Sequence, residues 1–150
     1  MTLRIGIDPG CSGALVVLKD GAYVAHMLMP TLKVGTKTRV NGAAIKAFLE
    51  EYTHGSHVYL EQVGAMPGQG VSSMFTFGHA AGVVEGIVQG LGLPYTLVTP
   101  QKWKKVAGLI GSDKDAARSR AIQLFPDVRD LDFKGKGQAI ADAMLIAMVG

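Results

Sequence analysis

The chain has 150 residues, of which 48 % are hydrophobic and 18 % charged, so it is long and apolar enough for one folded domain and is not intrinsically disordered. Its single cysteine, Cys11, excludes an internal disulfide or a cysteine-rich zinc site and favours a cytosolic setting. A net charge of +3 makes the chain mildly basic, which on its own only suggests that it binds nucleic acid. No apolar run reaches the roughly 20 residues that span a bilayer, and the first residues are typical of a strand, not of a signal peptide.

The first stretch, LRIGIDPGCSGALVV at 3–17, predicts a β-hairpin. Apolar and other residues alternate up to Ile7, and the turn at 9–13 is rich in glycine. Asp8 ends the first strand beside glycines that let a ligand approach the backbone, so it is placed to hold a metal ion or a metal-bound phosphate. The alternative is that Asp8 simply starts an ordinary Asp-Pro-Gly turn.

Residues 22–29 alternate as a third strand, which short connections make antiparallel to the second. The segment 31–39 is polar and carries Lys33, Lys37 and Arg39. We expect a solvated loop there, with a loop that follows a nucleic-acid strand as the alternative.

Asn41 predicts the N-cap of a helix that runs to Tyr52, and residues 56–63 predict a buried strand. A strand, a helix and a second strand imply a crossover, which makes the second strand parallel to the first. Glu61 ends this strand, so Asp8 and Glu61 should share the sheet edge at which such folds place their sites. Two surface carboxylates with a structural role are the alternative.

Residues 64–70 predict an irregular loop, followed by a helix that starts at Ser72 or Ser73 and is rich in glycine and alanine. Glycine costs about 1 kcal/mol relative to alanine within a helix. We therefore expect a close approach to another element, or a two-fold dimer contact. For Met74, Phe75 and Phe77, core packing is the preferred role and base stacking the alternative.

A strand at 93–99 precedes a basic segment from Thr99 to Arg120. The segment predicts a short helix that Trp103 anchors to the core, and a second helix that Ser112 caps. The second helix should turn Ala117, Ala121, Leu124 and Phe125 inward. Six cations (Lys102, Lys104, Lys105, Lys114, Arg118 and Arg120) against Asp113 and Asp115 give a local charge of +4, more than that of the whole chain. Such a concentration is typical of phosphate-backbone binding, with a solvated helix pair as the alternative.

Residues 128–137 predict an exposed loop, and 138–149 the last helix. Asp142 is the only ionised residue in that helix, and an unpaired carboxylate in an apolar helix is costly to bury. Arg118 or Arg120 would pair with it structurally, or a metal ion shared with Asp8 and Glu61 would do so functionally. Carboxylate oxygens are what Mg²⁺ prefers, and two ions about 4 Å apart can activate water and stabilise the leaving oxygen of a phosphodiester.

Four segments, in this order, resemble the motifs of RuvC-type Holliday-junction resolvases, and phage-encoded members are the most similar. The segments are IGIDPGCSGALVV, LEQVGAM, TPQKWKKVAGLIGSDKDAARSRA and GQAIADAMLIA, and the resemblance covers nearly the whole chain. It implies one ribonuclease H-like domain over 1–150, an α/β fold with a mixed five-stranded sheet of three antiparallel and two parallel strands and helices on both faces. It also implies a homodimer on four-way or branched DNA, no membrane association, and the cytoplasm of a bacterium or phage-infected host.

The resemblance assigns Asp8, Glu61 and Asp142 as catalytic metal ligands for Mg²⁺, or Mn²⁺ as substitute, with two ions. It makes Lys104 and Lys114 DNA contacts, within a DNA-binding set of Lys102, Lys104, Lys105, Lys114, Arg118, Met66 and Phe75. The family usually carries a fourth ligand, Asp or His, where this chain has Ala139. The amide oxygen of Gln138, or Asp132, would take that role.

The leading hypothesis is therefore a structure-selective endonuclease that nicks opposed strands of a four-way junction and leaves 5′-phosphate and 3′-hydroxyl ends. A catalytically weak branched-DNA-binding module of the same fold, limited by the change at Ala139, is the second. A small actin- or hexokinase-like ATPase is the third, because IGIDPGCSG also resembles the first phosphate motif of those folds. Those proteins repeat the fold, and this chain is too short to do so.

Overall fold

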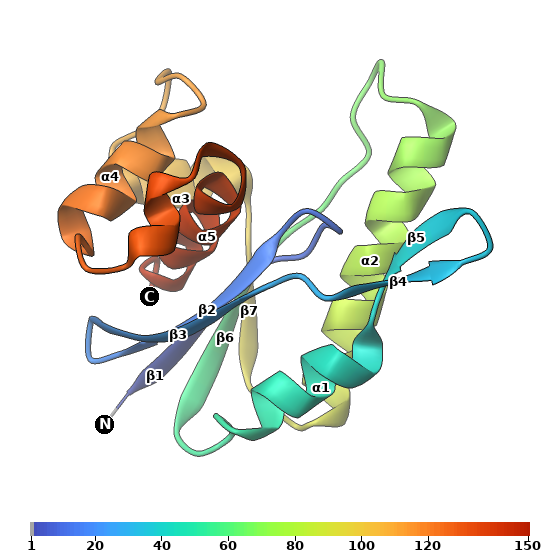
Figure 1. Ribbon diagram of the computed structural model, residues 1–150, viewed down its shortest axis with the longest axis horizontal. Coiled ribbons are helices and arrows are strands. Elements are labelled where there is room, and N and C mark those ends of the chain that lie inside the picture. Colours follow the sequence, from blue (N-terminus) through green and yellow to red (C-terminus); the bar gives the residue numbers. More distant parts are fainter. Residues whose placement is uncertain (1) are drawn as a thin grey trace.

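A mixed five-stranded β-sheet lies at the centre of the computed structural model, which describes residues 2–150 (Figure 1). Met1, counted in the predicted domain, lies outside the described residues. The strand order is β3 (Ala22–Leu28), β2 (Ala14–Lys19), β1 (Leu3–Asp8), β6 (Ser56–Glu61), β7 (Tyr95–Val98). Strands β1, β2 and β3 pair antiparallel, whereas β6 pairs parallel with both β1 and β7. This confirms the predicted sheet and the parallel pairing of the first and fourth of its strands.

Helices cover both faces of the sheet, as predicted (Figure 1). On one face lie α1 (Gly42–Glu50) and α2 (Val71–Gly90); on the other lie α3 (Pro100–Ala107), α4 (Ala116–Leu124) and α5 (Lys134–Ala147). Strand β2 is buried on both faces and divides its side chains between them. Leu15 and Val17 join the core under α1 and α2, and Val16 and Leu18 join the core under α4 and α5. Each face is thus closed by its own hydrophobic core.

The glycine-rich helix α2 differs from the prediction in three respects. It starts at Val71, after the N-cap Gly70. A Cβ added at Gly78, Gly82 or Gly86 would meet nothing within 4 Å, so these glycines serve no close approach within the described chain. Phe75 is 66 % exposed, so core packing is the wrong role for it. These three glycines therefore form an open face of α2.

By length and mean hydropathy (1.2) alone, α2 could cross a membrane, and it is the one such helix within residues 2–150. From the sequence we expected no segment to be long and apolar enough to span a bilayer. Ala80, Val84 and Val88 are nevertheless buried against the sheet. Helix α2 therefore packs as a core helix on its inner side.

The segment 31–39 is not a loop. It forms a separate two-stranded sheet from β4 (Thr31–Val34) and β5 (Lys37–Val40), which turns at Gly35 with φ +64°. The alternation of β-branched residues with lysine and arginine fits an exposed ribbon as well as a loop, and charge alone does not distinguish the two. Asn41 then caps α1 as predicted, because its Oδ1 accepts from the Ala44 backbone nitrogen at 3.2 Å.

Three further expectations in the C-terminal third were wrong. Helix α4 begins at Ala116, because Asp113 Oδ1 accepts from the Asp115 nitrogen at 3.1 Å and holds a turn where Ser112 was expected to cap a helix. Leu124, which was expected to face inward, is 43 % exposed. Residues 128–137 are not an exposed loop, because they contain the short 3₁₀ helix η1 (Arg129–Asp132), whose Leu131 is fully buried, and the first turn of α5.

Helix α5 lies directly against β1 at Gly6, and this contact gives the first prediction. A Cβ at Gly6 would overlap the Ala143 carbonyl and lie 2.7 Å from the Ala147 backbone nitrogen. Gly6→Ala should therefore lower the free energy of unfolding by about 3 kcal/mol, measured by urea denaturation. Gly135→Ala is the control, because a Cβ there meets nothing within 4 Å, and it should leave stability unchanged or raise it by up to about 1 kcal/mol. Equal effects of the two changes would contradict this packing.

Candidate active site

Three carboxylates gather at one edge of the sheet. Strands β1 and β6 pair in parallel up to Ile7 and Leu60, so the next residues, Asp8 and Glu61, leave adjacent strands at the same edge. Helix α5, which packs across β1 and β2, adds Asp142. Their charges interact: burial, then Glu61 and Asp142, raise the pKa of Asp8 to about 7. Elements far apart in the sequence thus bring three acids within electrostatic reach.

The pKa values of the other two carboxyl groups, Asp142 and Glu61, are also raised. Burial first, and then the charge of Glu61, raise the pKa of Asp142 to about 6 against a lowering hydrogen bond from Gln138. Burial likewise raises the pKa of Glu61, although the Trp103 hydrogen bond and the charge of Lys104 oppose it. The edge therefore concentrates negative charge that the protein alone does not neutralise.

The carboxylates of Glu61 and Asp142 each accept a hydrogen bond from a side chain. Trp103 Nε1 donates to Glu61 Oε2 at 2.7 Å, and Gln138 Nε2 donates to Asp142 Oδ1 at 3.0 Å. Among residues 2–150, no three His, Cys, Asp or Glu side chains are arranged as a ready metal site. The chemistry still fits a divalent cation, because oxygen donors suit Mg²⁺ and a cation would relieve the mutual repulsion of these acids. Each of the two hydrogen bonds occupies only one oxygen of its carboxylate.

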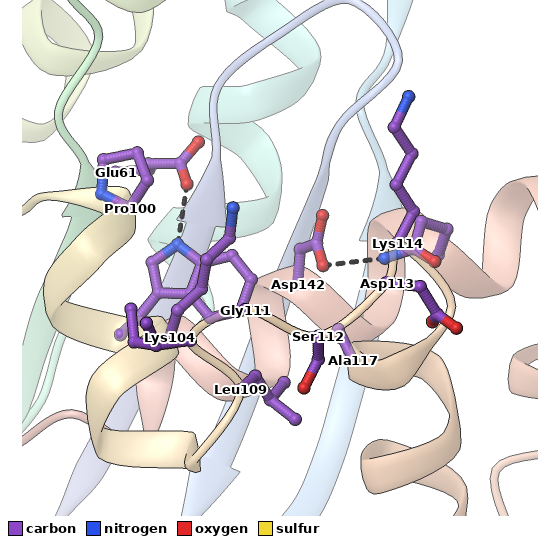
Figure 2. Close-up of a pocket in the computed structure, with 13 residues that line it drawn as sticks. Glu61, Pro100, Lys104, Leu109, Gly111, Ser112, Asp113, Lys114, Ala117 and Asp142 are labelled. Carbon is purple, nitrogen blue, oxygen red and sulfur yellow. Dashed lines mark hydrogen bonds between the residues drawn. The ribbon is translucent and has the colours of Figure 1, made fainter.

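A cleft of about 460 Å³ opens beside these acids (Figure 2). Glu61 and Asp142 line it together with Lys104 of α3 and Lys114 of the α3–α4 connection. Trp103 and Ala117, both buried, also line it. The cleft can therefore present carboxylate oxygens and ammonium groups to the same ligand.

A second cleft of about 440 Å³ contains Asp8, and it shares Asp142, Gln138 and Lys114 with the first. Lys134 also lines it, a lysine that sequence reasoning missed. The signal was present in the sequence, because Lys134, Gln138 and Asp142 follow one another at four-residue spacing and so share a face of α5. Asp142 thus lies where the two clefts meet.

The remaining candidate residues divide into free and engaged groups. The exposed candidates are Lys102 and Lys105 on α3, Met66 in the 62–70 loop (64 % exposed) and Phe75 on α2 (66 % exposed). Arg118 is engaged: its Nε donates to Asp115 at 2.9 Å and its Nη1 to the Leu131 carbonyl at 3.1 Å.

Of the two alternatives considered for Asp142, an arginine partner or a shared metal ion, the arginine partner is wrong. Arg118 instead pairs with Asp115, and Arg120 Nη2 donates to the Ala107 carbonyl at 3.1 Å. Asp132, offered as a replacement ligand, pairs with Arg129 at 2.9 Å. Ala139 is 5 % exposed and packs in the core under α4 and α5, and it also lines the cleft of Asp8 and Asp142, but its methyl side chain offers no ligand atom.

The strand order, the mixed pairing and the helices on both faces define the α/β fold of ribonuclease H-like nucleases. Within that class, the chain has the fold of RuvC-type resolvases. It is similar to Thermus thermophilus RuvC in complex with a Holliday junction substrate, with a TM-score of 0.70 and 16 % identity over 99 % of this chain and 92 % of that one. A second Thermus thermophilus RuvC structure gives a TM-score of 0.58 and 19 % identity over 98 % and 92 % of the two chains. No protein-family model matches the chain, and no curated protein does.

The raised pKa of Asp8 gives a prediction on stability. Well below the ordinary pKa of 3.8 the group is protonated in both states. As the pH rises from 3.8 towards 7, only the unfolded chain loses the proton freely, so the folded state loses stability. Asp8→Asn should thus stabilise the protein at pH 8 by roughly 2–4 kcal/mol relative to its effect at pH 4. Urea denaturation of both proteins at pH 4, 6 and 8, without divalent ions, measures this.

Asp130→Asn is the control of opposite sign. Hydrogen bonds from His26 and Lys136 lower the pKa of Asp130, so its contribution is present above the ordinary value and lost as the pH falls. This variant should lose stability at pH 8. A pH-independent effect of Asp8→Asn would refute the buried-charge account.

Proposed function

We propose that the protein is a structure-selective endonuclease that resolves four-way DNA junctions by metal-dependent phosphodiester hydrolysis. The observation that carries the proposal is the cleft that joins Glu61 and Asp142 to Lys104 and Lys114. The likeness in fold to a RuvC bound to a Holliday junction substrate supports the choice of DNA structure. We expect such a protein in the cytoplasm of a bacterium or a phage-infected host.

In this proposal, Asp8, Glu61 and Asp142 hold Mg²⁺, with Mn²⁺ as substitute and two ions in all, and Gln138 supports Asp142. The ions supply charge stabilisation and an activated water. Lys104 and Lys114 bind the phosphate that is to be cut, and Lys102, Lys105 and Lys134 bind its neighbours. The water oxygen bonds to phosphorus while the bond from phosphorus to the 3′ oxygen breaks. The water releases a proton and the 3′ oxygen takes one up through solvent, which leaves a 5′-phosphate and a 3′-hydroxyl.

Two symmetric cuts need two copies of the chain. The open face of α2, along Gly78, Gly82 and Gly86, would let a second helix approach closely about a two-fold axis. Met66 and Phe75, exposed in the 62–70 loop and in the first turns of α2, would contact the junction by apolar packing and base stacking.

A branched-DNA-binding module with weak catalysis is the second candidate. Two observations favour it: the buried Ala139 supplies no ligand, and both Glu61 and Asp142 accept hydrogen bonds inside the protein. No observation favours the ATPase hypothesis.

Cleavage of a synthetic four-way junction separates the two candidates. Wild-type protein should nick opposed strands in Mg²⁺, and Asp142→Asn should slow cutting by at least about 100-fold, because an ion ligand is lost. Binding should be unchanged or tighter, since repulsion of phosphate falls. Asp127→Asn is the control, because Asp127 is exposed on the connection after α4. If wild type binds the junction without nicking it, the binding module is correct.

The role of the basic segment is tested by salt dependence. Lys104→Ala should weaken junction binding and reduce the slope of log K against log salt by about 1, because one phosphate contact is lost. The matched control is Lys46→Ala, since Lys46 lies on α1 and pairs with Glu50 at 3.1 Å. Fluorescence anisotropy over a salt series gives both slopes. Equal slopes for wild type and Lys104→Ala would remove this segment from the DNA interface.

A further inference from the structure

Trp103 is held in one position by its helix and by the core. Thr99 caps α3, because its Oγ1 accepts from the Lys102 backbone nitrogen at 3.2 Å, and Pro100 begins the helix. The indole is 4 % exposed and belongs to a core cluster with Val98, Ala117, Leu145 and Ile146. A large ring enclosed in this way has little rotational freedom.

This fixed ring holds Glu61. Its Nε1 donates to Glu61 Oε2 at 2.7 Å, from α3 to the last residue of β6 (Figure 2). A hydrogen bond to an ionised carboxylate is short and strong, and indole is a donor only, so it cannot compete with the carboxylate for a cation. The contact occupies one oxygen of Glu61 and leaves Oε1 for a ligand. Trp103 therefore limits both the direction and the free donor atom of this carboxylate.

The same turn of α3 also contributes Lys104 to the cleft. Lys104 follows Trp103 in sequence, its Nζ lies 5.5 Å from the centre of the indole ring, and it lines the cleft. Helix α3 thus fixes a carboxylate with its buried face and presents an ammonium group with its exposed face. One rigid element sets the spacing between the two.

We propose that Trp103 is a positioning residue that orients Glu61 for the divalent cation and sets its distance from the phosphate-binding Lys104. The inference rests on the proposed function, because it takes Glu61 as a ligand of Mg²⁺. Trp103 acts through Glu61 and, as a donor only, is not itself a ligand of the ion. Groups that orient a metal ligand commonly contribute 10- to 100-fold, as an order of magnitude, to metal affinity or activity.

The first test needs no substitution in the core. Trp103 is the only tryptophan, so an NMR spectrum of ¹⁵N-labelled protein contains one indole N–H signal. Titration with Mg²⁺ alone should move this signal in a saturable way, with the midpoint that calorimetry gives for ion binding. In Glu61→Ala the signal should shift upfield and no longer respond. An indole signal that stays still while the ion binds would overturn the proposal.

The second test removes the donor. Trp103→Phe should weaken Mn²⁺ binding by about 10-fold in calorimetry, and should lower kcat for junction cutting at an unchanged KM. Phe125→Leu is the matched control, because Phe125 is buried in a different cluster and its loss costs core volume without touching Glu61. Circular dichroism confirms that both variants fold. Unchanged ion affinity and kcat in Trp103→Phe would overturn the proposal.

These outcomes separate the inference from the function on which it rests. If the indole signal follows Mg²⁺ and Trp103→Phe binds Mn²⁺ more weakly, the positioning role stands even when no junction is cut, and only the proposed reaction fails. If wild type cuts junctions while Trp103→Phe keeps its ion affinity and kcat, only the positioning role fails. A wild type that binds no divalent ion overturns both.

Discussion

The parallel pairing of β1 with β6 is the constraint on which the site depends. Its register brings Asp8 and Glu61 to one sheet edge, and α5 can add Asp142 there only because Gly6 lets the helix lie directly on β1. The result is a group of three buried carboxyl groups whose pKa values are all raised, first by burial and, for Asp8 and Asp142, also by the charges of neighbouring acids. Such an arrangement costs stability, and the cost falls when a cation binds.

Besides the charge of Lys104, the protein limits this repulsion with neutral hydrogen-bond donors, and among the described residues no salt bridge pairs these acids. Trp103 and Gln138 each bind one oxygen, and the Gly10 backbone amide favours the charged form of Asp8. Neutral donors leave the net charge in place, whereas a salt bridge would have cancelled it. The arginines of α4 are directed elsewhere, towards Asp115 and towards backbone carbonyls. The carboxylates therefore stay oriented and still attract a cation.

Sequence patterns predicted the sheet and the shared edge of Asp8 and Glu61, because strand alternation and a crossover helix fix direction and register. They failed where side-chain contacts decide the outcome. The Asp113 turn delayed the start of α4, and the alternation within 31–39 was indistinguishable from a basic loop by charge alone. The burial of Leu131 in η1 and the engagement of Arg118 depend on long-range contacts. The Trp103–Glu61 hydrogen bond joins residues 42 positions apart, so no local pattern reveals it.

The engagement of Arg118 has a consequence for the entropy of binding. Its guanidinium ties α4 to the carbonyls of Leu131 and Asp132, and Gly137 lets the first turn of α5 lie against that same Leu131 carbonyl. Helix α4 and the start of α5 are thereby joined through η1, so this part of the basic region is ordered before any polyanion arrives. The conformational freedom of these segments is already lost during folding, and a ligand that binds there meets a preorganised surface with a smaller entropic penalty.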